Sequence, residues 1–465
     1  MGSTALEKGA ASGAAGAGPR RALTFGLCMA VVAVAFEAIS VATAMPSAAR
    51  ELDGLDLYAW VFSVFLIGQL FATVAAGRLC DRIGVARPMV GGVVLFAVGL
   101  AVSGTAATME QLIAGRLVQG LGSGVVSVGM YVVIAQVYDE RRRPRMFSYI
   151  SSAWIVPSFV GPAVAAWLTH HLTWRAVFWA VLPLLAVGAA LMLPPVIRAA
   201  RSPGPKDPTA APAAALWAAG LAALGAAGVQ FAGQRLTPVG LLVGAVGVGL
   251  VGISLPQLMP PGFFRFGPGL APVITVRTLI AGAFFGAEAF VPLMLVEQRH
   301  LSLLVAGSTL TVGAVGWGVG AWLQSLRRLP LRRDRVISLG AGCVLIGITL
   351  VALVGWRQWW VGVVVVAWVF AGVGMGLATS STSVATMTLS GAGEQGRNAS
   401  SLQFGEAFGA GFFVGVGGTI FATTRPTGDL TMTFGSVLTA MAAVAVLALL
   451  TSLRIGPISA SAPPE

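Results

Sequence analysis

The sequence predicts an all-α integral membrane protein of 14 transmembrane helices, built as two pseudo-symmetric six-helix bundles plus a two-helix insertion. Composition, apolar runs and an internal repeat support this prediction. Of 465 residues, 56% are hydrophobic and 10% charged, whereas soluble domains carry about 25% charged residues. Abundant Gly and Ala suit helices that pack backbone to backbone in lipid.

Apolar runs of about 18 or more residues predict the spanning helices. They lie near 23–44, 58–76, 88–107, 111–137, 147–168, 174–194, 213–233, 237–255, 273–296, 302–324, 336–356, 359–387, 399–422 and 431–453. Proline-rich breakers at 201–212 and 256–269 divide the runs into groups of six, two and six.

These groups predict five segments. A Gly/Ala/Ser-rich start predicts a disordered cytoplasmic tail, and the first apolar run is too long for a signal-peptide core, so we expect it to be retained. The predicted segments are the tail (1–20), the N-terminal bundle (21–198), a cytoplasmic linker with the hairpin insertion (199–272), the C-terminal bundle (273–456) and the C-terminal tail (457–465).

The distribution of positive charge predicts the topology. An even number of helices places both tails on one side, and 22 of the 29 basic residues fall on that side. Cytoplasmic segments of membrane proteins carry this excess, so we expect a multi-pass protein of the cell (inner) membrane with both tails in the cytoplasm. The net charge of +12 therefore reflects topology and does not indicate a nucleic-acid partner.

Cysteine and histidine spacing indicates no metal site and no cofactor. The three cysteines form no C-x-x-C pair, and the three histidines fall in short connections. The chain also lacks a G-x-x-x-x-G-K-[ST] nucleotide loop and a nucleophile–histidine set in the membrane. We therefore expect neither an enzyme nor an ATP-driven pump.

A glycine pattern that repeats within the chain supports two related halves. The stretch "QGLGSG" (119–124) lies in the fourth predicted helix of the first half, and "AGVGMG" (371–376) lies in the fourth of the second. Repeated six-helix bundles are a common design of secondary transporters, with the substrate site at the repeat interface.

The connection "GRLCDRIGVAR" (77–87) carries Gly77, Asp81, Arg82, Gly84 and Arg87. This spacing resembles the signature loop of the major facilitator superfamily, which implies a conformational latch on the inner side. We expect Gly77 to permit close helix packing and Asp81 to accept hydrogen bonds from a helix N-terminus and pair with an arginine. The corresponding stretch of the second half, 320–328, has Gln324 at the aspartate position, which disfavours a symmetric latch.

Three more stretches narrow the resemblance to the 14-helix drug:H⁺ antiporter branch. They are "RLVQGLGSG" (116–124), "PSFVGPAVAA" (157–166) and "FEAISVATAMP" (36–46). The second keeps the Gly161-Pro162 pair of the antiporter motif but has Pro157 where glycine is usual, and the third has Glu37 in place of an aspartate. The resemblance implies a monomeric, proton-coupled exporter of amphipathic drugs or related small hydrophobic compounds.

Four ionisable residues inside predicted spans are the strongest candidates: Glu37, Arg116, Glu288 and Glu406. Such residues are expensive in hydrocarbon and indicate functional sites. At 1.5 Å per residue, the first three lie about 10, 8 and 12 Å from the outer end of their helices. Glu406 lies about 10 Å from the inner end of its helix.

These charges suggest proton coupling. The rings of Phe284 and Phe285, one turn before Glu288, disfavour its charged form. We hypothesise that Glu37 or Glu288 carries the exchanged proton and that Arg116 competes with the proton for a carboxylate. Other interpretations stay open: Arg116 extends to the outer surface, or Glu37 and Arg116 form a static ion pair. Glu406 has two alternatives, contact with inner-face water and hydrogen bonding to Gln403.

Two groups of side chains are candidates for a substrate cavity. The polar candidates are a stripe along one helix face after Arg116, with Gln119, Ser123, Ser127 and Tyr131, and Gln403 in a later span. Aromatic candidates are Phe284, Phe285, Trp154 and Trp317. The alternatives are a hydrogen-bonded helix contact for the stripe and ordinary packing for each aromatic ring.

Two other transport functions remain in competition with drug export. One is a proton-coupled metabolite symporter, which the Gly161-Pro162 pair and the scarcity of hydrogen-bonding side chains elsewhere disfavour. The other is an exporter of lipid or glycolipid, for which a lateral opening between helices is expected. In each case the expected partners are a small molecule, protons and the lipid bilayer.

Overall fold

The computed structural model describes residues 17–138, 142–199, 216–234, 237–265, 267–325, 331–357, 359–391 and 394–458. The predicted linker stretch 201–212 and most of both predicted tails lie outside these residues. The first half contains α2 (Ala17–Glu51), α3 (Tyr58–Ile83), α4 (Ala86–Gly104), α5 (Met109–Val137), α6 (Arg143–Ser152), α7 (Ile155–His171) and α8 (Arg175–Ala199).

A hairpin and a second half complete the chain. The hairpin contains α9 (Leu216–Gln234) and α10 (Pro238–Leu258). The second half contains α11 (Leu270–Glu297), α12 (Leu303–Ser325), α13 (Arg333–Arg357), α14 (Gly362–Leu389), α15 (Gln395–Thr424) and α16 (Leu430–Ser452). Short 3₁₀ turns are η1 (Leu55–Leu57), η2 (Phe263–Arg265) and η3 (Arg425–Thr427).

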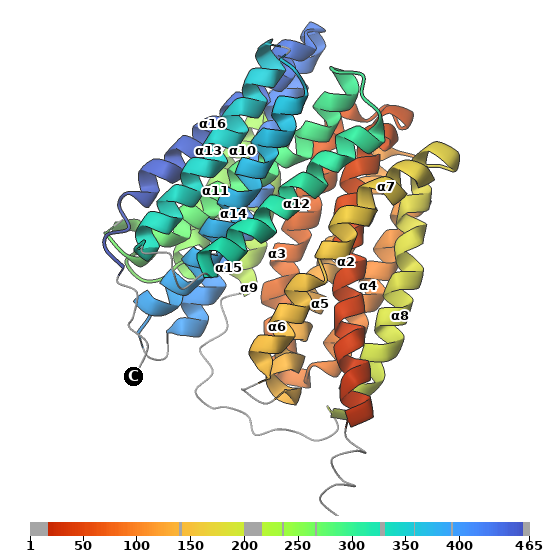
Figure 1. The fold of residues 1–465 in the computed structure, drawn as a ribbon, viewed down its shortest axis with the longest axis vertical. Helices are drawn as coiled ribbons and strands as arrows, with labels where there is room; N and C mark the ends of the chain where they lie inside the picture. The colour runs from red at the N-terminus through yellow and green to blue at the C-terminus, as the bar shows by residue number, and fades with distance from the viewer. Residues whose placement is uncertain are drawn as a thin grey trace, which may run out of the picture.

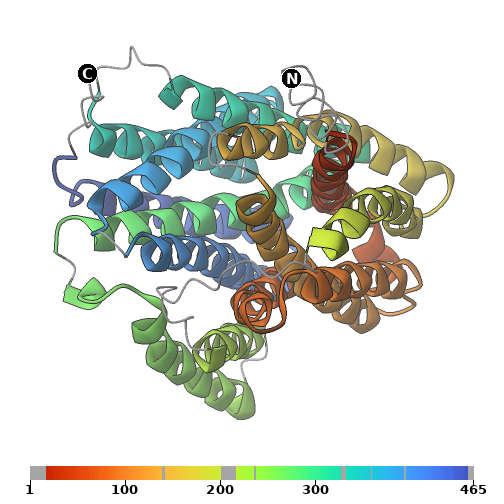
Figure 2. The ribbon, with the colours of Figure 1, turned by 90° about the horizontal axis from the view of Figure 1, so that it is seen from below.

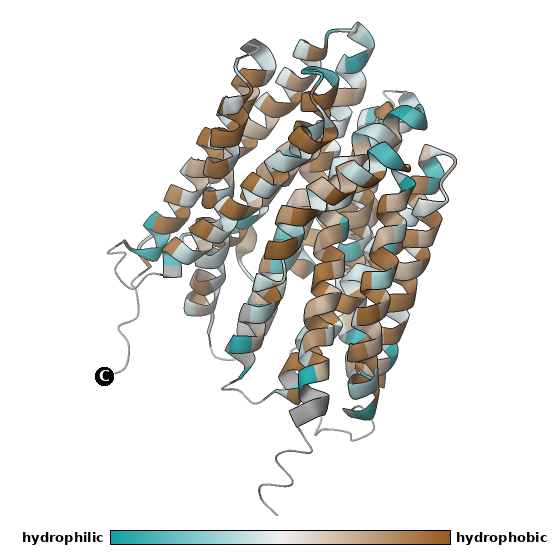
Figure 3. Ribbon diagram, turned by 45° about the vertical axis from the view of Figure 1, so that its right-hand side comes forward, coloured by the Kyte–Doolittle hydropathy of each residue, from teal (hydrophilic) through white to brown (hydrophobic). Residues whose placement is uncertain are grey.

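The helices run side by side in two groups, α2–α8 and α11–α16 (Figure 1). Among the described residues, 13 helices are long and apolar enough to cross a membrane, and α6 with α7 supplies the remaining predicted span. Apolar residues cover the long outer faces of the helices (Figure 3). The predicted all-α membrane fold is confirmed, whereas the domain boundaries stay a prediction.

The repeated glycine pattern sets the packing inside each half. A Cβ atom at Gly120 would lie 2.2 Å from the carbonyl oxygen of Phe65 in α3, and one at Gly122 would lie 2.4 Å from the amide nitrogen of Phe96 in α4. The second half repeats this arrangement, because α14 places Gly372 against α12 and Gly374 against α13. Alternate glycines thus let α5 and α14 fit between two neighbours each, as small residues do in membranes.

The fifth predicted span is broken, which corrects the expectation of one helix over 147–168. The chain forms a turn at Ala153 and Trp154 between α6 and α7. Pro157 explains the break, because its ring clashes with the carbonyl four residues earlier, at Ala153, and it has no N–H to donate there. The Ser158 amide then begins the hydrogen bonding of α7, at 3.1 Å from the carbonyl of Trp154.

The two halves contact each other mainly on the side away from the described ends of the chain. We call the side where the described chain begins and ends the tail side (bottom of Figure 1), and the other the opposite side. The halves pack through α2 against α11 and α12, α3 against α15, and α7 against α12, whereas α5, α6 and α14 pack extensively only within their own half. Two cross-half ion pairs lie on the opposite side, Arg50–Glu297 and Arg425–Asp56.

The hairpin covers one seam between the halves. It lies at the edge of the bundle (Figure 2), where α9 packs against α3 of the first half and α15 of the second. The indole nitrogen of Trp60 donates a hydrogen bond to the side chain of Gln234. A Cβ atom at Gly225 would lie 2.6 Å from the carbonyl of Gly247, so these glycines bring α9 and α10 together.

Replacement of Gly120 by alanine tests the packing of α5. We expect Gly120→Ala to lower the free energy of unfolding by about 1–3 kcal/mol, because the added methyl overlaps rigid backbone. Thermal unfolding of the purified protein in detergent measures the effect. Gly318→Ala in α12 is the matched control, since its Cβ would meet no atom within 4 Å. Equal unfolding temperatures for the two variants would contradict the packing described.

Candidate functional site

A buried ion pair joins α2 to α5. The guanidinium Nη1 of Arg116 contacts Oε1 of Glu37, and the two side chains are 4% and 0% exposed. The second carboxylate oxygen, Oε2, has no hydrogen-bond partner among the described residues. Because a lone charge at the bilayer centre costs about 2.5–3.5 kcal/mol on insertion scales, each of these charges depends on the other.

Further contacts fix Arg116 inside the first half. Its Nε donates to the carbonyl of Val61 at 3.0 Å, and its Nη1 also donates to the side chain of Gln119. The guanidinium carbon lies 4.2 Å from the centroid of the Phe65 ring, a cation–π geometry. Gln119 in turn donates to the Ser103 hydroxyl at 3.0 Å. Arg116 therefore does not extend to the outer surface in this structure.

The Gly161-Pro162 pair connects the helix of Glu37 to the second half. Gly161 lets α7 approach α2, and its carbonyl accepts a hydrogen bond from the Ser40 hydroxyl at 3.3 Å. Pro162 has no N–H, so the carbonyl of Ser158 loses its helical partner. The hydroxyl of Thr311, from α12, donates to this carbonyl. The motif thus lies where α2, α7 and α12 meet.

Glu288 differs from Glu37 in its surroundings. It is partly exposed, and it makes no hydrogen bond or ion pair in the part of the chain that the structure describes. Phe284, one turn earlier in α11, is fully buried. The next residue, Ala289, accepts a hydrogen bond at 2.9 Å from the hydroxyl of Tyr58 in α3. Glu288 therefore lies beside a contact between the halves.

A second ion pair includes a residue that the sequence analysis missed. Arg277 of α11 donates to Oε2 of Glu406 at 2.7 Å and to the Thr382 hydroxyl at 3.0 Å. Arg277 is buried. The sequence analysis counted it with the basic residues of the connection before this helix, because it lies only four residues after the start of the predicted span. Glu406 thus pairs with arginine, and Gln403 is exposed.

The polar stripe changes character along α5. Gln119 and Ser123 are buried, and Ser123 accepts a hydrogen bond from Gln69 of α3 at 3.2 Å. Ser127 is partly exposed, and Tyr131, nearer the tail side, is 54% exposed and interacts electrostatically with Glu406 of the other half. The first two residues form helix contacts in this conformation, and the substrate role of the stripe stays a prediction.

Aromatic rings gather in the second half. Phe284 packs between Trp317 and Trp368, with ring centroids 5.8 and 5.4 Å away. Phe285 also packs against Trp317, at 6.2 Å, and Trp154, at the break between α6 and α7, is 43% exposed. Trp368 was not among the predicted residues. Contact of these rings with substrate stays a prediction.

Most of the predicted latch loop (77–87) is helical, because α3 continues to Ile83 and α4 begins at Ala86. Gly84 ends α3 with a φ of +79°, which favours glycine. Arg82 and Arg87 are exposed. The expectation that Gly77 brings helices together is wrong for this conformation, because a Cβ there would meet nothing within 4 Å. The side chain of Asp81 lies outside the described residues, so the latch itself stays a prediction.

The described residues contain no group of three His, Cys, Asp or Glu side chains placed to hold a metal ion. Two rigid helical halves with acids at or near their junction are instead the architecture of secondary transporters. The profile of the Major Facilitator Superfamily matches residues 25–414. The chain belongs to this family, which places it among transporters rather than enzymes.

Relatives share a limited part of the sequence. An uncharacterized MFS-type transporter of Mycobacterium tuberculosis is 34% identical over 40% of this chain and 26% of its own length. The efflux pump roqT of Penicillium rubens is 32% identical over 37% of this chain and 32% of its own. The multidrug transporter protein MdtP of Bacillus subtilis is 29% identical over 35% of this chain and 30% of its own. The chain thus matches about a third or less of these relatives' lengths.

Solved structures support the fold. A POT-family peptide transporter has a TM-score of 0.67 at 16% identity, covering 93% of this chain and 94% of its own. The human organic anion transporter MFSD10 has a TM-score of 0.60 at 15% identity, covering 93% of this chain and 99% of its own. At these identities the likeness concerns the fold alone.

A double-mutant cycle tests the buried ion pair. We expect Arg116→Gln to lower the free energy of unfolding by about 3–5 kcal/mol, because it leaves the buried Glu37 charge unpaired. The double variant Glu37→Gln/Arg116→Gln should lose less than the sum of the single variants. Thermal unfolding in detergent compares the wild type, Glu37→Gln, Arg116→Gln and the double variant. Strict additivity of the losses would show that the two side chains do not interact.

Proposed function

We propose that the protein is a proton-coupled antiporter that exports small amphipathic compounds by alternating access. The observation that carries the proposal is Glu288, an acid in a membrane helix without a described partner, beside a contact between the halves. Intramembrane acids without a structural partner mark proton or ion pathways. The relative roqT, an efflux pump, agrees with export.

The tail side is the cytoplasmic side in this proposal, and the membrane is the cell membrane. The excess of basic residues in segments of that side supports this orientation. The halves are joined toward the opposite side, so the structure corresponds to the state that receives substrate from the cytoplasm. We further propose that the transporter acts as a monomer, since each chain contains both halves.

The three acids differ in their surroundings, which suggests different roles for them. Glu288 would take up a proton when its surroundings open to the outside and release it when they open to the cytoplasm. Glu37 would exchange its proton against Arg116, with which it is paired in the present state. Glu406 would alternate in the same way against Arg277. Because each ion pair forms only while its carboxylate is unprotonated, protonation would change the contacts of the two helices that carry the pair.

Amphipathic substrates fit the side chains nearest the junction. Phe285 and Trp317, which pack on the buried Phe284, offer partly exposed aromatic surface. Trp154 and Tyr131 expose rings on the first half. Such rings bind apolar molecules without demanding one hydrogen-bonding pattern. A lipid exporter would need a passage between α7 and α12, which are joined here by the Thr311–Ser158 hydrogen bond.

Transport driven by a pH gradient tests the coupling. We expect Glu288→Gln to abolish gradient-driven movement of toxic amphipathic compounds in inside-out vesicles, because a glutamine carries no exchangeable charge. Glu37→Gln should have the same effect by removing the carboxylate for which Arg116 and the proton compete. The readout is uptake of a compound to which cells expressing the wild type are resistant.

The matched control is Glu110→Gln, which neutralises an exposed acid in the first turn of α5 and should leave uptake unchanged. If Glu37→Gln and Glu288→Gln both retain gradient-driven transport, the coupling assignment is wrong. Resistance to no compound in a broad panel would favour a lipid or a physiological metabolite as the substrate.

A further inference from the structure

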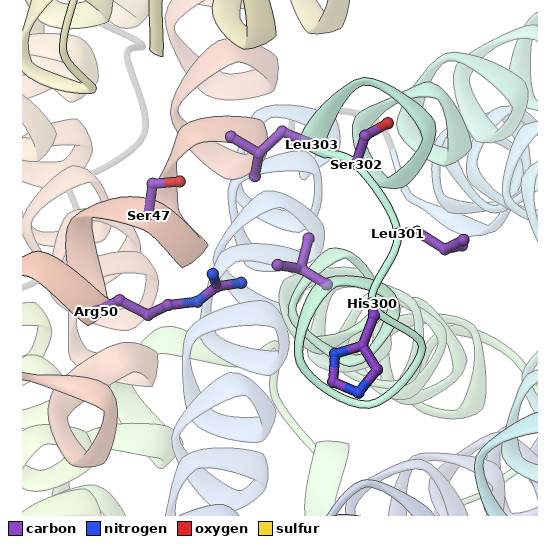
Figure 4. Close-up of a pocket in the computed structure, with 7 residues that line it drawn as sticks. Ser47, Arg50, His300, Leu301, Ser302 and Leu303 are labelled. Atoms are coloured by element: carbon purple, nitrogen blue, oxygen red, sulfur yellow. The ribbon is translucent and has the colours of Figure 1, made fainter. Parts of the chain in front are cut away.

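The opposite side of the junction carries a cavity of 380 Å³ that the proposed transport cycle does not use. Ser47 and Arg50, at the end of α2, line it from the first half (Figure 4). The second half contributes the end of α11 and the start of α12, with Val296, His300, Ser302 and Leu303. The volume lies within the range of about 300–1,000 Å³ typical of small-molecule sites.

Arg50 gives the cavity its binding chemistry. Only its Nε is engaged, by the carboxylate of Glu297, so the four N–H groups on its terminal nitrogens make no hydrogen bond within the described chain. The guanidinium points from α2 toward the connection between α11 and α12 (Figure 4). A planar guanidinium with free donors matches the oxygens of an acid group.

The wall from the second half is held in place. His300 has a φ of +52°, a conformation that residues other than glycine rarely adopt. The amide of Leu301 donates to the carbonyl of Leu295 at 3.0 Å, which fixes this connection. Val296 and Leu303 present aliphatic surface next to the polar groups. The cavity therefore combines a cationic group with an apolar wall.

We propose that this cavity binds a small amphipathic anion, with its acid group on Arg50 and its aliphatic part against Val296 and Leu303. Because the walls belong to different halves, the cavity exists only while the opposite side is closed. A ligand that binds one of two states shifts the equilibrium toward that state, so the bound anion inhibits transport from the opposite side. This inference does not depend on proton coupling or on the direction of transport.

Binding of 1-octanesulfonate, a permanently charged amphipathic anion, tests the site. The probe is added to wild type and three variants in phosphatidylcholine nanodiscs, and bound probe is measured by equilibrium dialysis. Arg50→Gln removes the guanidinium, and Ser47→Phe fills the cavity without changing charge. Arg425→Gln is the matched control, because it also breaks a cross-half ion pair on the opposite side but does not line the cavity.

We expect saturable binding to wild type and Arg425→Gln, and affinity at least about tenfold lower in Arg50→Gln and Ser47→Phe, as for the loss of one charged hydrogen-bonded contact. Equal binding to all four proteins, or none to wild type, would overturn the site. Nanodiscs that contain phosphatidylglycerol distinguish a lipid headgroup as the source of the anion, because the lipid would then compete with octanesulfonate.

Spin labels at Leu172 and Trp360, exposed residues of the two halves on the opposite side, report its closure. The labels are placed in the protein after the three native cysteines are replaced by serine, with no other change. We expect octanesulfonate to raise the ratio of short to long distances. Bound probe with an unchanged distance distribution would refute the inhibitory role.

Discussion

Close approach of helix backbones within each half is the constraint on which the rest of the structure depends. Helices in lipid gain little from burying apolar side chains, so they associate where small residues let backbones meet. Gly120, Gly122 and Gly124 of α5 and their equivalents in α14 provide these contacts in both halves. Each half is thereby a tightly packed body, and the contacts that can change lie between the halves.

The junction between the halves combines close packing at Gly307 and Gly418 with side-chain hydrogen bonds. One of these bonds exists because Pro162 leaves the carbonyl of Ser158 free for Thr311. Glu37 and Glu406 pair with arginines of their own half, whereas Glu288 lies beside the junction without a partner among the described residues. A proton that binds at Glu288 would therefore act where the halves move, and one at Glu37 would act through the position of Arg116.

Hydropathy and glycine spacing predicted the helix count, the two halves and the buried positions of Glu37 and Arg116, because these features repeat along the chain or stand out in apolar runs. The break at Ala153 was not predictable, since apolar residues continue through it and proline occurs within other helices here. Arg277 was missed because an arginine near a helix end often extends to the surface. The cavity at Arg50 depends on how α2 meets the α11–α12 connection, which no local pattern encodes.

The account requires the halves to separate where α3 meets α15. A Cβ at Gly411 would lie 3.4 Å from the Cβ of Leu66, close to the separation of about 3.8 Å in disulfides. The most direct measurement is transport by Leu66→Cys/Gly411→Cys, without native cysteines, before and after oxidation. We predict that the cross-link forms, stops transport and releases it on reduction. Full transport activity with the disulfide intact would contradict alternating access through this junction.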